Sequence, residues 1–206
     1  MTKGERTRRK IVADAAPVFN TRGYEGSSLN DLMSATGLKK GGIYRHFASK
    51  EELAAEAFDY AWAAALECRA PSADEKVSGV AWLKELIDNF VTRRPAVAGG
   101  CPLLNTAIEA DDGNPILRAR VSKALQLWTA QLETVVTRAM RQRQMRSGTD
   151  PRQVATIIVS TLEGALMMSR LEKHGDALQQ ARAHLHDYLD RLAIAAPRRR
   201  RTGHSA

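Results

Sequence analysis

Most of the side chains that could recognise a charged partner lie in one short stretch of the sequence. The stretch is GLKKGGIYRHFASKEEL, residues 37–53, and it combines four cations with a tyrosine, a histidine and two adjacent glycines. Lysine and arginine pair with phosphates and with guanine edges, and a phenol donates to a phosphate oxygen. Each glycine weakens a helix by about 1 kcal/mol. Because glycine has no side chain, the pair would let the backbone lie close to a polyanion. The cations are Lys39, Lys40, Arg45 and Lys50.

The charge of the whole chain also supports a polyanionic partner. The 206 residues carry a net charge of +8, to which residues 1–50 contribute +6 and residues 197–206 contribute +4. The residues between them contribute −2, so a basic head precedes a nearly neutral body. This distribution is typical of a nucleic-acid-binding head, although a solvated basic surface would carry the same charge. The run Arg198–Arg201 predicts a disordered basic tail over 197–206, with nonspecific attraction to DNA as the alternative.

Composition excludes several classes of protein. With 44% hydrophobic residues the chain is globular rather than disordered, and with two cysteines a disulfide framework is not expected. The basic N-terminus MTKGERTRRK is not followed by an apolar stretch, so we expect no secretory signal. We find no run of about eighteen apolar residues and expect no membrane span. The cytoplasm is therefore the expected location, and no cofactor or metal is expected.

The spacing of apolar residues predicts an all-α protein. Helical periodicity is present in almost every segment, and strand signals are nearly absent. Pro17 removes a backbone hydrogen bond inside the first helix, where we expect a kink or a local opening. Ser28 with Asp31, and Ser49 with Glu52, have the spacing of a capping box. The predicted helices cover about 5–22, 29–36, 40–47, 50–69, 74–93, 102–110, 115–146, 151–173 and 176–195.

These helices divide the chain into two domains. Residues 1–50 hold three short helices and form the head, and a connecting helix at about 50–69 leads out of it. Residues 70–196 hold the longer helices and form a larger helical domain. Chemistry directed at a polyanion is therefore expected in the first domain.

Two short helices joined by a tight turn near Gly37 form a helix-turn-helix candidate over about residues 28–47. In the second helix, Ile43 and Phe47 are four residues apart and are expected to point inward. The opposite face carries small, phenolic and cationic side chains, which suits a helix that enters the major groove by its N-terminus. The residues of that face are Gly41, Tyr44 and Arg45, with Lys39 and Lys40 at the N-terminal end.

A series of residues at fixed spacing runs through the whole head. The series is Gly23-Tyr24, then Ser28-Leu29-x-Asp31-Leu32, then Gly37-Leu38-x-Lys40-Gly41-x-Ile43-Tyr44-x-His46-Phe47-x-Ser49-Lys50-Glu51-x-Leu53. It resembles the DNA-binding head of the TetR family of bacterial regulators, and the resemblance covers about residues 5–60. The resemblance implies an all-helical homodimer whose two heads bind a palindromic operator. It also implies that a small molecule in the C-terminal domain releases the operator.

The resemblance implies phosphate contacts at four positions of the head. Tyr44, His46 and Lys50 would contact phosphate directly. Ser28 would cap the first helix of the motif against phosphate. The alternatives are that Tyr44 packs with an exposed tip and that His46 caps or packs.

Other residues of the motif would lie at base edges. The resemblance places Lys40 and Gly41 there. Two positions depart from the family, because Lys39 stands where a small hydroxyl residue is frequent and Gly42 where a hydroxyl residue or alanine is frequent. Base recognition then depends mainly on Lys39, Lys40 and Arg45, unless the two lysines are only a solvated charge pair.

A ligand pocket in the second domain would be mostly apolar, with a few polar groups. Cys101 follows a Gly-Gly pair and precedes a predicted helix, a position that would lower the pKa of its thiol. The loop around Cys101, residues 98–105, resembles a Gly-Cys segment found in part of the family. The Cys101 thiol could sense electrophiles or oxidants. The alternative is that Cys101 packs in the core. For each of the other pocket candidates, the alternative is that it is an ordinary core residue. The predicted pocket residues are Trp82, Leu86, Phe90, Cys101, Leu104, Ile108, Trp128, Leu132, Leu166 and Met167.

The last two long helices suit a dimer interface. The helix at 151–173 is apolar on most sides, and the helix at 176–195 has one apolar face. Two such pairs would form a four-helix interface around a twofold axis, as the family does with its last two long helices. The alternative is that both helices close the core of the monomer. The predicted interface residues are Leu162, Leu178, Ala181, Leu185, Tyr188 and Leu189.

The leading hypothesis is a ligand-responsive transcriptional regulator that acts as a repressor. One alternative is a helical enzyme, but His184 and His186 are two residues apart and do not share a helix face. Asp111 and Asp112 are better explained as a solvated helix end than as a catalytic pair. A second alternative is a protein that binds DNA without sequence preference, which the paired glycines and the basic tail would allow.

Overall fold

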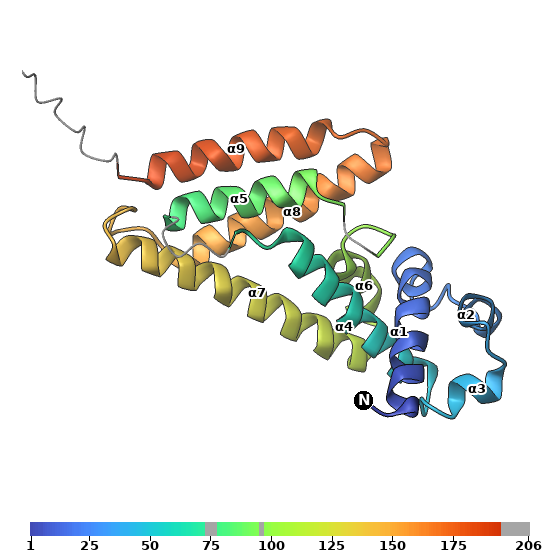
Figure 1. Ribbon diagram of the computed structural model, residues 1–206. Helices are drawn as coiled ribbons and strands as arrows, with labels where there is room; N and C mark the ends of the chain where they lie inside the picture. Colours follow the sequence, from blue (N-terminus) through green and yellow to red (C-terminus); the bar gives the residue numbers. More distant parts are fainter. Residues whose placement is uncertain (73–77, 95–96, 195–206) are drawn as a thin grey trace, which may run out of the picture.

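The computed structural model describes residues 1–72, 78–94 and 97–194 and confirms the all-α class (Figure 1). Helices α1–α3 form a small head, and longer helices form the body at the other end of the molecule. Among the described residues, an isolated bridge between Met145 and Ala193 is the one pairing of β type. The predicted tail at 197–206 lies outside the described residues. The helices are α1 (Lys3–Arg22), α2 (Leu29–Thr36), α3 (Lys40–Tyr44), α4 (Lys50–Arg69), α5 (Gly79–Thr92), α6 (Pro102–Ala110), α7 (Pro115–Arg141), α8 (Pro151–Glu172) and α9 (Asp176–Leu192).

A small apolar core holds the head together. Ile11 of α1, Leu32 of α2 and Ile43 of α3 are almost completely buried against one another. Phe47, just after α3, and Leu53, in the first turn of α4, are buried in the same core. Complete burial of a side chain of this size contributes about 1.5–3 kcal/mol. Four helices therefore share one core, which fixes the direction in which α3 presents its other face.

Local sequence signals set several helix ends. The Ser28 hydroxyl accepts from the Asp31 N–H at 3.1 Å and the Asp31 carboxylate accepts from the Ser28 N–H at 2.9 Å, so this capping box is confirmed. Gly37 ends α2 in the left-handed conformation, at φ 67°. Ser49 caps α4 by accepting from the Glu52 N–H at 3.2 Å. The Glu52 carboxylate accepts from the residue before Ser49 and does not complete a second box.

Helices α3 and α7 end earlier than predicted for a reason that the backbone shows. α3 stops at Tyr44 rather than near residue 47, because the chain tightens and the His46 N–H bonds to the carbonyl three residues back at 2.9 Å. α7 stops at Arg141 rather than at 146, because Arg143 adopts a left-handed φ of 55°. Pro17 lies inside α1, and the helix continues on both sides of it.

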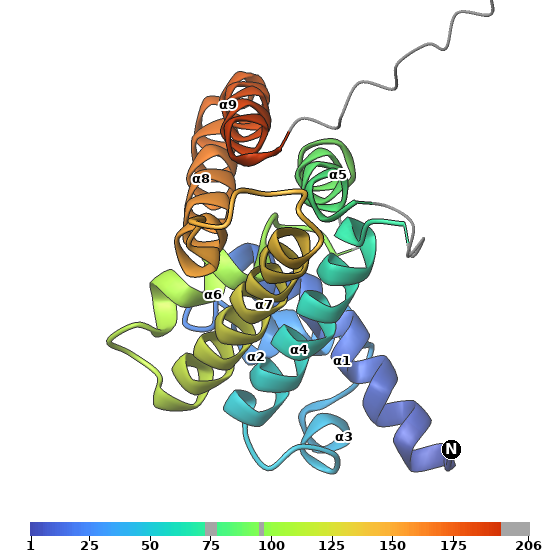
Figure 2. The ribbon, with the colours of Figure 1, turned by 90° about the vertical axis from the view of Figure 1, so that its left-hand side faces the viewer.

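The body is built from long helices around one core. α8 packs between α7 and α9, and α5 packs against α9 and α7. Figure 2 shows α8 and α9 side by side at one edge of the body, with α4 and α7 running down toward the head. By length and composition α8 could cross a membrane, yet 44% of its most apolar window is buried inside the protein. One side of α8 is therefore part of the protein core, and the other side leaves Met168 and Leu171 exposed.

The residues predicted for the dimer interface belong largely to this core. Leu162, Leu185 and Leu189 are 0% exposed within the single chain, so they have no surface to offer to a second copy. For these three the prediction was wrong, and the alternative that they close the monomer core is correct. The same core takes up half-buried Leu178 and Tyr188. The error arises because sequence periodicity marks an apolar face without telling which surface covers it.

Candidate DNA-binding surface and effector site

The outer side of α3 carries the residues predicted to recognise base edges. Lys39, Lys40 and Arg45 are exposed, whereas Ile43 on the inner side is buried. Lys39 occupies the N-cap position of α3 and makes no capping hydrogen bond with its side chain. The head therefore presents a short cationic helix on a rigid apolar support, the arrangement expected of a helix that enters the major groove.

The two adjacent glycines of α3 have different surroundings. A Cβ atom built on Gly41 would meet nothing within 4 Å, whereas one built on Gly42 would lie 3.4 Å from the Cβ of Leu38. Neither glycine has a positive φ, so backbone conformation alone does not require them. Gly41 is thus the position at which the backbone of α3 is open to a partner, and Gly42 faces its own head.

The residues predicted to contact phosphate lie just before α2, at the end of α3 and just after it, and at the start of α4. Ser28 is exposed at the N-terminus of α2, Tyr44 is exposed and His46 is half-buried. The Lys50 ammonium lies 4.3 Å from the ring centroid of Tyr24, within the range of a cation–π contact. That contact links the start of α4 to the turn between α1 and α2. Their binding to phosphate stays a prediction.

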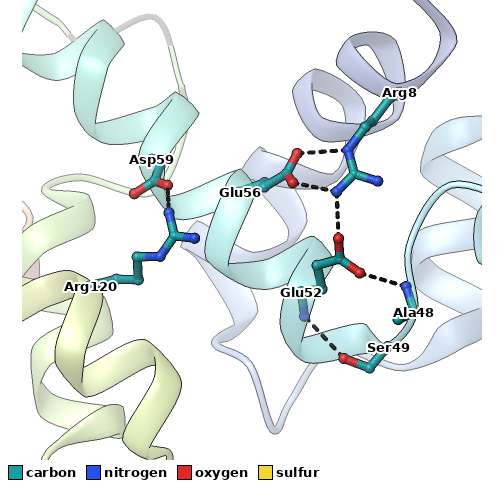
Figure 3. Close-up of polar contacts among 7 residues, drawn as sticks. All are labelled: Arg8, Ala48, Ser49, Glu52, Glu56, Asp59 and Arg120. Carbon is teal, nitrogen blue, oxygen red and sulfur yellow. Dashed lines mark hydrogen bonds and ion pairs between the residues drawn. The ribbon is translucent and has the colours of Figure 1, made fainter. Parts of the chain in front are cut away.

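Sequence reasoning missed Arg8, which joins α1 to α4 and to the turn after α3 (Figure 3). Its guanidinium forms ion pairs with Glu56 and, at 2.6 Å, with Glu52, and lies 4.2 Å from the ring centroid of Phe47. The Glu52 carboxylate also accepts from the Ala48 N–H at 2.6 Å. The hydrogen bond to Glu56 is the main cause that raises the pKa of Arg8, and the Ala48 N–H is the main cause that lowers the pKa of Glu52. The sequence signal that could have predicted this contact is the pair Glu52 and Glu56, one helical turn apart on α4, together with the basic residues of α1.

Another ion pair ties α4 to the body. Asp59 pairs with Arg120 of α7, on a side of α4 that faces away from Arg8 (Figure 3). Burial raises the pKa of Asp59, and the nearby Arg120 charge opposes this rise. α4 therefore carries acids that hold the head on one side and the body on the other.

α6 holds the head through two polar side chains. The Glu109 carboxylate accepts from the backbone N–H groups of Tyr24 at 2.5 Å and Glu25 at 2.6 Å. The Asn105 amide donates to the backbone carbonyl of Asn20 at 2.9 Å and to its side chain at 3.0 Å. We call Asn105 and Glu109 the α6 clamp. Sequence reasoning missed it, because its partners lie about eighty residues away and local spacing gives no sign of them.

Eight of the ten predicted pocket residues come together in the core of the body. Phe90 stacks on Trp128 with ring centroids 6.4 Å apart. Ile108 is 68% exposed and Met167 is 44% exposed, so the prediction that they line the interior was wrong. Both lie on sides of their helices that face solvent. The eight residues are Trp82, Leu86, Phe90, Cys101, Leu104, Trp128, Leu132 and Leu166.

Cys101 lies buried between two charged side chains that sequence reasoning missed. Its thiol donates to Oε1 of Glu163 at 2.9 Å, and a guanidinium nitrogen of Arg69 lies 3.4 Å from its sulfur. Burial raises the pKa of Cys101 to about 11, so the predicted lowering at a helix N-terminus was wrong. Burial also raises the pKa of Glu163. We call Arg69, Cys101 and Glu163 the buried polar trio.

A small cavity lies where the head meets the body. It is lined by residues of α1, α4, α6 and α7, among them Phe19, Phe58 and Asn105. Its volume is about 20 Å³, which is enough for about one water molecule. A drug-sized ligand needs a pocket of about 300 Å³ or more. An effector of that size could therefore use this place only if side chains move.

Comparison with known proteins bears on both domains. The family described as "Bacterial regulatory proteins, tetR family" matches residues 11–57, and the family described as "Tetracyclin repressor-like, C-terminal domain" matches residues 79–185. The second match alone covers more than half of the chain. The chain belongs to the TetR family.

Individual TetR-family members are similar over nearly the whole chain. A TetR transcriptional regulator from Chloroflexus aurantiacus has 41% sequence identity and a TM-score of 0.89, covering 95% of this chain and 100% of its own. The transcriptional repressor DhaR of Mycobacterium sp. (strain GP1) is 22% identical, covering 84% of this chain and 87% of its own. The transcriptional regulator LmrA of Bacillus subtilis is 27% identical, covering 90% and 97%.

Membership of the TetR family decides between the classes of function. The family and these relatives are helix-turn-helix transcriptional regulators, so the hypothesis of a helical enzyme is excluded. The observed head carries the residues predicted to face DNA on or beside a short helix of its own, α3, which fits that role. Within the described ranges, no cluster of three His, Cys, Asp or Glu side chains could hold a metal ion.

Proposed function

We propose that this TetR-family regulator is a cytoplasmic repressor that binds a palindromic operator as a homodimer and releases it when a small molecule enters the body. The observation that carries the proposal is the exposed cationic face of α3, with Lys39, Lys40 and Arg45 on it. The similarity to DhaR, a transcriptional repressor, supports repression rather than activation. Neutralising several phosphates per head would make operator affinity fall steeply with salt.

For the homodimer we place the interface on the outer face of α8. Gly164, Met168 and Leu171 follow one another at steps of four and three residues, so they share one side of the helix. Met168 is 47% exposed and Leu171 is 76% exposed, and a Cβ atom built on Gly164 would meet nothing within 4 Å. A glycine on such a face lets a second helix approach closely, and a twofold axis brings two identical faces together.

Sedimentation tests this interface. Leu171→Asp should convert the dimer into monomers, because the new carboxylate would be buried without a partner. Ile116→Asp is the matched control, since Ile116 is 48% exposed on α7 and lies far from α8 in the chain. Dimers that persist in Leu171→Asp would place the interface elsewhere.

For release, we propose that α6 and α4 carry the signal from the body to the head. The α6 clamp bonds to the end of α1 and to the turn after it, and the Asp59–Arg120 pair holds α4 to α7. A shift of either helix changes the orientation of the head. In a dimer, this alters the separation of two heads that must match half-sites about 34–36 Å apart. The coupling needed for release is about 1–3 kcal/mol.

The clamp can be tested without knowing the effector. Glu109→Gln keeps the size of the side chain but weakens its bonds to two backbone N–H groups. The head should then be less firmly oriented, and operator affinity should fall about threefold to tenfold while the melting temperature changes little. Glu67→Gln, exposed on α4, is the control. Equal affinity in both variants would remove the clamp from the pathway.

The whole proposal is tested with DNA from the region upstream of the gene. Fluorescence anisotropy compares this DNA with a scrambled sequence of the same length at several salt concentrations. We expect a preference of about a thousandfold for the operator, and a stoichiometry of two chains per site. Equal affinity for both sequences would instead support a protein that binds DNA without sequence preference.

A further inference from the structure

One oxygen of the buried polar trio lacks a hydrogen-bond partner. Oε1 of Glu163 accepts from the Cys101 thiol at 2.9 Å, but Oε2 has no partner among the described residues and is shielded from solvent. Glu163 as a whole is 7% exposed. Buried polar atoms are nearly always paired, because an unpaired one costs free energy. The Oε2 atom therefore marks a position at which a donor from outside the chain would stabilise the protein.

The trio lies where several helices of the body meet. Arg69 ends α4, Cys101 immediately precedes α6, and Glu163 belongs to α8. The Arg69 guanidinium lies 4.0 Å from the ring centroid of Phe90 in α5, and that ring stacks on Trp128 of α7. A ligand at Oε2 would thus meet the polar trio within a core whose other members are aromatic and aliphatic, the composition of a small-molecule site.

The charges of the trio decide which ligands fit. Arg69 and Glu163 contact the same sulfur, at 3.4 Å and 2.9 Å, so their opposite charges already balance in part. With Glu163 ionised, a cationic ligand would leave the Arg69 charge without its counterpart, and an anionic ligand would oppose Glu163. Either would bury a charge that is not compensated, which is costly. A neutral ligand avoids both costs.

A hydroxyl group satisfies Glu163 in either protonation state. An ionised carboxylate needs a donor, and a protonated carboxyl group needs an acceptor. Burial raises the pKa of Glu163, while the Cys101 thiol and the Arg69 charge oppose this rise and favour the ionised form on which the charge balance depends. A hydroxyl donates and accepts, whereas an ether or a ketone only accepts.

We propose that Glu163 is the polar recognition point of the effector, and that the effector is a neutral, largely apolar molecule with a hydroxyl group. The inference rests on the proposed function, since it names the chemical class of the molecule that releases the operator. The hydroxyl binds Oε2, and the apolar part displaces half-buried side chains such as Leu104 and Leu166. Because Cys101 precedes α6, entry beside it moves the helix that carries the α6 clamp.

Four probes of similar shape test the chemical class on the full chain. They are 4-methylphenol, toluene, benzylammonium and benzoate, and binding is followed by calorimetric titration and by thermal shift. We expect 4-methylphenol to bind about tenfold more tightly than the other three, because a hydrogen bond to a buried charged group is among the stronger ones. Tighter binding of either ion, equal binding of toluene, or no binding of any probe would overturn the proposal.

Variants on α8 test the position of the site. Glu163→Met removes the acceptor and keeps an unbranched side chain, so the preference for 4-methylphenol over toluene should fall from about tenfold to none. The control is Glu67→Met, since Glu67 is a glutamate that is exposed, on α4. A preference retained in Glu163→Met would overturn the assignment. If that variant melts below the assay temperature, Glu163→Gln takes its place, with an expected preference of about threefold.

Operator binding is measured on the same samples. Wild-type protein that binds the operator but shows no preference for 4-methylphenol contradicts this inference alone. Protein that shows the preference but does not bind any operator contradicts the proposed function, and the assignment of Glu163 then stands as a ligand site. The two failures are therefore distinguishable.

Discussion

The head and the body of this regulator use charged side chains in opposite ways. In the head, Lys39, Lys40 and Arg45 are exposed on a helix whose inner side is held by an apolar core. In the body, Arg69 and Glu163 are buried on either side of one thiol. Exposed cations retain their hydration until DNA replaces it, so they cost the fold little. Buried charges are costly, so in the proposed site they would admit only a ligand that leaves them balanced.

This contrast teaches that the two domains recognise their partners by different physics. The basic head would attract any polyanion over a distance comparable to the Debye length, and the proposed base contacts would then discriminate between sequences. On the proposals above, the body would exclude most molecules, because entry would require both movement of core side chains and a polar group that matches Glu163. The following predictions test each half of the contrast, beginning with the largest effect.

Removal of the inner support of α3 should have the largest effect. Phe47 is 2% exposed and supports the Arg8 guanidinium, so Phe47→Ala should destabilise the head by about 3–5 kcal/mol. Urea unfolding measures the change. Tyr44→Ala is the control, since the side chain is exposed and its removal should change stability by about 0.5 kcal/mol or less. Similar losses in both variants would show that the exposed face also supports the fold.

The two cysteines should differ strongly in reactivity. Cys101 is buried with a pKa raised to about 11, whereas Cys68 is half-buried. Only the thiolate is nucleophilic, so near pH 8 iodoacetamide should modify Cys101 at least about a hundredfold more slowly than Cys68. Mass spectrometry of timed samples measures both rates, and unfolding in urea should make them equal. Rapid native modification of Cys101 would restore the hypothesis of a thiol sensor.

The exposed cations should matter for DNA and not for the fold. Arg45→Ala should weaken operator binding about tenfold to a hundredfold and relax specificity, because a base contact is worth about 1–3 kcal/mol. The control is Arg141→Ala, since Arg141 is exposed at the far end of α7. Anisotropy with operator and scrambled DNA provides the measurement. An operator affinity and a preference over scrambled DNA that are unchanged in Arg45→Ala would show that Arg45 does not recognise bases.

Much of the head could be predicted from the sequence because its signals are local. The capping box at Ser28, the left-handed Gly37 and the inward positions of Ile43 and Phe47 all depend on spacings of four residues or fewer. The length of α3 could not be predicted in the same way. Spacing locates a buried face, but it does not show where the backbone tightens after Tyr44.

The body could be predicted only in outline, because its decisive contacts join distant segments. Cys101 meets Glu163 across 62 residues, and Glu109 meets Tyr24 across 85 residues. Local reasoning therefore predicted a lowered pKa for Cys101, whereas burial raises it. Local reasoning also predicted that the apolar face of α9 contacts a second copy, although the core of the same chain covers that face. Periodicity identifies which residues are buried, but only tertiary packing shows which surface covers them.

The smallest effects should separate the two adjacent glycines. Alanine favours a helix over glycine by about 1 kcal/mol, and neither position needs a positive φ. Gly41→Ala and Gly42→Ala should therefore each stabilise the head by up to about 1 kcal/mol, as measured by urea unfolding. If the free backbone of Gly41 meets DNA, the two variants must nevertheless differ in operator affinity.

Their difference is fixed by where the added methyl group would lie. At Gly41 it would project into open space on the outer side of α3, so operator binding should weaken about threefold to tenfold despite the gain in stability. At Gly42 it would lie 3.4 Å from Leu38 within the head, so affinity should stay close to that of the wild type. The reverse order of affinities would mean that Gly42 faces the groove, and the orientation assigned to α3 on DNA would have to be rotated accordingly.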